Sequence, residues 1–168
     1  MILAFIIVVI FASAMFMAAF KDATTMTIPN WISLFLIAGF FVVIPFVWPG
    51  WADFGTHLLV GLTFFAAGFA MFAFGWLGGG DAKLMAATGL WWQWLDAASY
   101  VLTTTLIGAA LAFGLIIGRK FIPVRVLTAP WAYKMFKDET KMPYGLALAA
   151  GALLTLPQSQ IFLRANGL

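Results

Sequence analysis

The chain is 168 residues long, with 64% hydrophobic residues, 9% charged residues and a formal net charge of +3. Soluble domains carry roughly 25% charged residues, so this composition excludes an ordinary soluble domain and indicates an integral membrane protein. The absence of cysteine excludes disulfides, thiol catalysis and cysteine-ligated zinc. The few charges lie in short loops, so they bear on membrane topology, and we expect no nucleic-acid partner.

Six apolar runs predict an all-α bundle of six transmembrane helices, which suits this length at roughly 20 residues per span. We interpret the first run as a retained helix and not a signal peptide, because no Lys or Arg precedes it. The fourth run is short, and it can cross the membrane only if Asp81 lies at or just inside the membrane edge. The expected spans of this single domain, residues 1–168, are residues 1–20, 31–48, 55–77, 82–95, 97–118 and 143–163.

The basic residues predict the orientation of these spans. Counting loops alternately from the amino terminus places all but one of the nine Lys and Arg residues on one side, with Arg164 alone on the other. Basic loops stay in the cytoplasm. We therefore expect the amino terminus outside and the loops at 21–30, 78–83 and 119–142 inside. Asp22 and Asp81 then lie on the same, cytoplasmic face.

These two carboxyls are the candidate catalytic groups. Asp22 closes the first apolar run and Asp81 opens the fourth, at positions where a charge is costly in a membrane protein. Two carboxyls a few Å apart share a proton, so one can act as base and the other as acid while a water attacks a peptide bond. The alternative is that both are ordinary charges at helix ends, exposed to the cytoplasm. Spacing alone does not choose between these two interpretations.

Glycines and prolines surround the two acids. The run Gly78-Gly79-Gly80 directly precedes Asp81, and it lets another backbone come close, as binding an extended peptide requires. A flexible hinge between two spans is the alternative. Pro29, which follows Asp22, and Pro143 each suit the start of a helix. Tyr144, with an apolar ring and a polar tip, suits a membrane interface.

Other polar residues carry less weight. His57 is the single histidine, and we place it near the outer end of the third span without ligand partners. We therefore expect neither a metal nor another cofactor. Asp53 and Asp96 are expected to be solvated charges in the outer loops.

The arrangement resembles the type IV prepilin peptidases, membrane aspartic proteases with a Gly-x-Gly-Asp motif. The run Gly78-Gly79-Gly80-Asp81 matches that motif, and Asp22 with the downstream Ile28-Pro29-Asn30 matches the first catalytic aspartate and its Ile-Pro-Asn. Lys141 and Pro143-Tyr144-Gly145 match a later element of the family. The resemblance implies that Asp22 and Asp81 are catalytic. It implies a supporting role for Gly78, Gly80, Lys83, Pro29, Asn30, Lys141, Pro143, Tyr144 and Gly145.

The family resemblance also implies a location, a substrate and partners. Members remove the short basic leader of prepilins, just before the hydrophobic helix, at the cytoplasmic face of the bacterial inner membrane. The implied partners are a prepilin, the lipid bilayer and the pilus assembly machinery. Met26 and Thr27 stand where many members carry basic residues. The chain lacks the cysteine-rich domain of larger members, so we expect no methyltransferase activity, and it resembles the compact peptidases of tight-adherence (Flp) pilus systems.

Two other functions remain open from the residues alone. A small transporter or channel subunit is one, because membrane acids often serve proton or cation pathways. It would place acids deeper in the spans, with broken helices near the midplane. The other is a non-catalytic assembly subunit, against which the presence of both aspartates argues.

Overall fold

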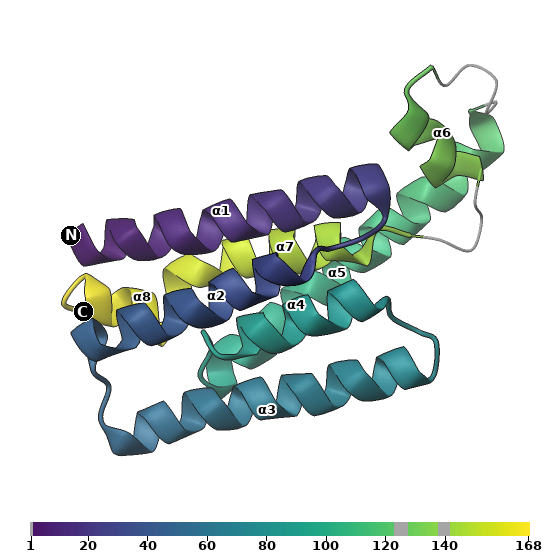
Figure 1. Ribbon diagram of the computed structural model, residues 1–168. Coiled ribbons are helices and arrows are strands. Elements are labelled where there is room, and N and C mark those ends of the chain that lie inside the picture. The colour runs from purple at the N-terminus through teal and green to yellow at the C-terminus, as the bar shows by residue number, and fades with distance from the viewer. Residues whose placement is uncertain (1, 123–127, 138–141) are drawn as a thin grey trace.

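A computed structural model describes residues 2–122, 128–137 and 142–168, and all the secondary structure in these ranges is helical. Both chain termini lie at one end of the bundle, and α6 lies at the other (Figure 1). The long helices are α1 (Ile2–Thr25), α2 (Asn30–Val43) with its continuation η1 (Ile44–Val47), α3 (Trp51–Ala73) and α5 (Trp94–Phe121). The short ones are α4 (Gly79–Gly89), α6 (Pro130–Lys137), α7 (Tyr144–Thr155), η3 (Leu156–Gln158) and α8 (Gln160–Ala165).

Four of these segments are long and apolar enough to cross a membrane, namely α1, α2 with η1, α3 and α5. Their outward faces carry large exposed hydrophobic side chains such as Phe5, Phe65 and Leu102. Helices suit such surroundings because they satisfy their own backbone hydrogen bonds. The protein is therefore a multi-pass membrane protein.

The centre of the bundle is aromatic. Phe11 of α1 meets Trp91 edge-on, with ring centroids 5.1 Å apart, and meets Trp92 in the same way at 5.5 Å. Both tryptophans are fully buried, and Trp91 Nε1 donates a hydrogen bond to the Leu36 carbonyl of α2 at 3.3 Å. The turn that joins α4 to α5 thus lies inside the bundle.

Two elements are shorter than the expected spans. The helix α4 has 11 residues and begins at Gly79, where residues 82–95 were expected to form a span. Its rise of about 16 Å is half of a ~30 Å membrane core. In the buried turn that follows α4, the Leu90 carbonyl accepts a hydrogen bond from Nδ1 of His57 in α3, at 3.0 Å. The last expected span, residues 143–163, divides into α7, η3 and α8.

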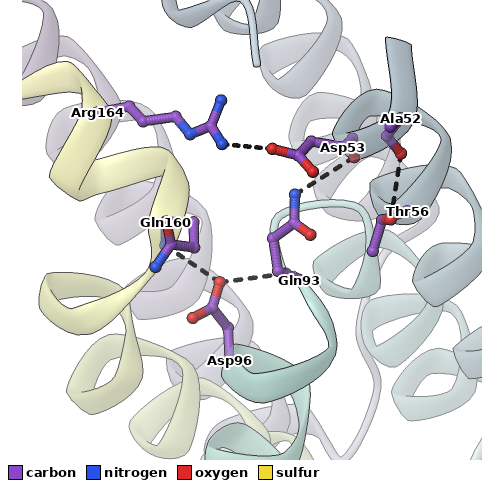
Figure 2. Close-up of polar contacts among 7 residues, drawn as sticks. All are labelled: Ala52, Asp53, Thr56, Gln93, Asp96, Gln160 and Arg164. Atoms are coloured by element: carbon purple, nitrogen blue, oxygen red, sulfur yellow. Dashed lines mark hydrogen bonds and ion pairs between the residues drawn. The ribbon is translucent and has the colours of Figure 1, made fainter. Parts of the chain in front are cut away.

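A polar network joins α3, α5 and α8 at the end of the bundle that holds both termini (Figure 2). Asp96 is buried, and its Oδ2 accepts hydrogen bonds from the backbone N–H groups of Gln93 and Gln160, both at 3.1 Å. The prediction that Asp96 is a solvated loop charge is therefore wrong. Asp53 is partly exposed but pairs with Arg164, and its carbonyl accepts a hydrogen bond from Gln93 Nε2 at 3.3 Å. Helix starts leave backbone N–H groups unpaired, and Asp96 satisfies two of them.

Asp96→Ala tests this network. We expect a loss of about 1–3 kcal/mol in the free energy of unfolding, because two partly buried N–H groups lose their acceptor. Asp53→Ala is the matched control, with an expected loss of about 0–1 kcal/mol for a partly exposed ion pair. Thermal unfolding in detergent micelles measures both. Equal losses for the two variants would contradict the buried role of Asp96.

Candidate active site

Asp22 lies in the last turn of α1, where the chain leaves the helix by an unusual residue. Met26 has φ +57°, the left-handed conformation that glycine commonly adopts after a helix, and its N–H donates to the Asp22 carbonyl at 2.8 Å. The chain then passes through the buried Ile28 and the extended Pro29 to the start of α2. This sharp turn at the end of α1 places Ile28 against the start of α4, the helix that carries Asp81.

Asp81 is the third residue of α4, after the N-cap Gly78. The backbone N–H of Gly78 interacts with the Asp81 carboxyl, as the N-cap N–H does with an acidic third residue in a capping box. A helix amino terminus favours negative charge, so α4 presents Asp81 at a site suited to a carboxylate. The glycine run is thus the first turn of a helix and not a hinge loop.

The two acids meet at the start of α7. The backbone N–H of Gly145 interacts with both carboxyls, that of Leu146 interacts with Asp22, and the two carboxyls act on each other electrostatically. Asp22 is 4% exposed and Asp81 8%. Within the described residues, Oδ2 of Asp22 and Oδ1 of Asp81 are buried without a hydrogen-bond partner. Buried polar atoms are normally satisfied, so these two oxygens are candidates to bind a water or a substrate.

The glycines make room for the protein's own side chains. A Cβ on Gly80 would lie 3.0 Å from Ile28 Cβ and 3.1 Å from its backbone nitrogen. A Cβ on Gly145 would lie 2.9 Å from Asp22 Oδ2, and one on Gly78 would lie 2.8 Å from Asp81 Oδ2. The interpretation that the run Gly78-Gly79-Gly80 lets a peptide backbone come close stays a prediction. Gly78, Gly80 and Gly145 allow the two carboxyls and Ile28 to fit together.

The remaining predicted site residues lie around this junction. Lys83 is exposed, and its Nζ donates to Asn30 Oδ1 at 2.9 Å, which joins α4 to α2. Pro143 is the N-cap of α7 and Tyr144 is its first residue. Lys141 lies outside the described residues. The role of Ile28 was not predicted, although its place in Ile28-Pro29-Asn30 was a signal.

The junction between α1, α4 and α7 therefore holds two buried carboxyls with unsatisfied oxygens, beside the glycines that flank them in sequence. A family model described as the type IV leader peptidase family matches residues 9–117. The chain belongs to the type IV leader peptidase family. The matched segment contains Asp22 and the motif ending at Asp81, so the resemblance seen in the sequence is confirmed and the chain is a peptidase. No curated protein and no solved structure gave a match.

Alanine substitutions in the glycine run test this packing. Gly80→Ala should lower the free energy of unfolding by about 1–3 kcal/mol, because the new methyl meets the Ile28 backbone, which cannot easily move. Gly79→Ala is the matched control, since its Cβ meets only the ring edge of Phe72 at 3.2 Å and alanine favours a helix over glycine. Thermal unfolding in detergent measures both. A Gly79→Ala loss as large as that of Gly80→Ala would contradict the Ile28 contact.

Proposed function

We propose that this leader peptidase is an aspartic endopeptidase in which Asp22 and Asp81 together activate a water. The observation that carries the proposal is the meeting of two buried carboxyls, from different helices, around the single N–H of Gly145. Both acids lie at helix ends and not at mid-span, which favours a peptidase over a transporter or channel subunit. The family membership supports the same reaction class.

The reaction uses one proton held between the two carboxyls. The ionised carboxyl takes a proton from a water, whose oxygen forms a bond to the carbonyl carbon of the scissile peptide. The protonated carboxyl donates a hydrogen bond to the carbonyl oxygen as it gains negative charge. The proton taken from water then passes to the leaving nitrogen as the C–N bond breaks. The proton belongs to the pair, so the acid and base roles belong to Asp22 and Asp81 jointly.

The proposed substrates are type IV prepilins of the Flp type, cut between a short basic leader and a hydrophobic helix. Supporting features are the compact chain without cysteine and the short connection of residues 26–29 between α1 and α2. These features also argue against methyltransferase activity. The proposed partners are the prepilin, the surrounding lipid and the pilus assembly machinery.

The proposed location is the bacterial inner membrane, with six crossings and the acids facing the cytoplasm. The skewed distribution of Lys and Arg supports this orientation. The acids lie near the end of α1 and the start of α4, at the end of the bundle opposite both termini (Figure 1). In this arrangement, α4 and α7 complete the bundle beside the four long spans.

Asn substitutions at the two acids test the mechanism. Asp22→Asn and Asp81→Asn should each lower the rate of leader removal by about 10²–10⁴-fold or more, the usual contribution of acid–base catalysis. Mass spectrometry of a co-expressed prepilin measures the cleaved fraction. Asp53→Asn is the control and should cleave at the wild-type rate, because it lies at the opposite end of the bundle. Normal processing by either site variant, at normal membrane levels, would refute the two-aspartate mechanism.

A further inference from the structure

The seam between α3 and α5 is open. The helix α3 packs along α4 and α5 packs along α7, but α3 and α5 touch each other at few residues. A cavity of about 440 Å³ lies in this seam, with Phe64 and Tyr100 in its lining. A second hollow, of about 500 Å³, shares Phe64, Val101 and Thr105 with it. Together they form what we name the α3–α5 slot, which runs along membrane-spanning helices and is lined mainly by apolar side chains.

One end of the slot reaches the candidate active site. Met85 lines it one helical turn after Asp81, and Tyr144 lines it directly before Gly145. Asp81 also acts electrostatically on Tyr100 inside the slot. A molecule lying along α5 would therefore present its end to the two carboxyls.

Tyr100 is a polar side chain in the slot that could recognise a bound molecule. Its side chain is 1% exposed, and its hydroxyl makes no hydrogen bond of normal geometry within the described residues, although the side chains of Thr88 and Thr104 lie close enough to act on it. The nearby Thr104 Oγ1 is likewise buried and unsatisfied there, while Thr88 gives its hydrogen to backbone carbonyls of its own helix. An unmade hydrogen bond of a buried group is costly, so a bound molecule with a polar atom would satisfy it. A lipid tail has no such atom, whereas a peptide backbone has a carbonyl at every residue.

We propose that the α3–α5 slot receives the apolar segment of the peptide substrate, with a backbone carbonyl accepting a hydrogen bond from Tyr100. The inference rests on the proposed function and adds the docking surface. The wall formed by α5 carries Gly108, Ala109 and Ala112, and small residues let a second backbone approach a helix closely. The slot thus holds the apolar segment in the membrane while its end lies at Asp81.

Cross-linking from single cysteines locates the substrate, because the chain has no cysteine of its own. Ala109 lines the slot and its neighbour Ala110 does not, so Ala109→Cys and Ala110→Cys form a matched pair. Each is placed in an Asp22→Asn, Asp81→Asn background with a prepilin that carries one cysteine in its apolar segment. A short bis-maleimide should cross-link the Ala109→Cys variant at least about fivefold more, since the linker must span a short distance. Equal yields, no cross-link, or more at position 110 would overturn the proposal.

Tyr100→Phe tests the hydroxyl. The ring contacts with Phe64 at 5.8 Å and Trp92 at 5.5 Å persist, so the unfolding temperature should be unchanged or higher. The KM for a full prepilin should rise about five- to tenfold, as expected for one lost hydrogen bond, with kcat retained. An unchanged KM would overturn the role of Tyr100.

Wild-type cleavage separates the two proposals. If the wild-type protein leaves prepilin uncut, the proposed function fails, and the slot proposal fails with it. If it cuts prepilin while the cysteine pair shows no preference for position 109, the proposed function stands and the slot proposal alone fails.

Discussion

The bundle depends on the placement of the start of α7 between the end of α1 and the start of α4. Two carboxyls cannot be withdrawn from water without compensation, because burial of a charge costs several kcal/mol. The N–H groups of Gly145 and Leu146 supply part of that compensation, and the amino-terminal partial charge of α7 adds to it. A carboxylate in the last turn of α1 is poorly placed with respect to its own helix, so Asp22 depends on α7 in particular. The remaining helices hold these three ends together.

Three short sequence elements form a single packing junction. The three elements are the segment from Asp22 to Ile28, the pair Gly80-Asp81 and the segment from Pro143 to Gly145. Ile28 of the first element contacts the glycines of the other two. The two glycines have no side chain there because Ile28 fills the space that a methyl group would need. The middle residue of the glycine run, Gly79, meets only the edge of a flexible ring. Steric demands at this junction therefore account for the second glycine of the Gly-x-Gly-Asp pattern, whereas the first, Gly78, leaves room for the Asp81 carboxyl.

The sequence predicted the long helices and placed the two acids at the same end of the bundle, because apolar runs and costly charges are local signals. The catalytic role of the two acids stays a prediction. It placed the end of the first span at residue 20, whereas α1 continues to Thr25, since charges mark a membrane edge and not a helix end. It treated residues 78–83 as a loop because Asp81 and Lys83 interrupt the apolar runs, whereas α4 begins within this segment, at Gly79. The burial of Asp96 was missed because its partners, Gln93 and Gln160, include a residue 64 positions away.

The open α3–α5 seam persists because the seams on either side of it are closed by backbone contacts. A Cβ on Gly151 of α7 would lie 3.0 Å from Thr104 Cα of α5, and one on Gly68 of α3 would lie 3.1 Å from the Ala82 carbonyl oxygen of α4. These close approaches fix α5 to α7 and α3 to α4, so neither long helix can move inward to fill the slot without losing them. The contact between Gly68 and Ala82 lies one residue after Asp81, so it also holds the start of α4, and the contact at Gly151 holds the middle of α7. The geometry that keeps the two carboxyls together therefore also keeps the path that leads to them open.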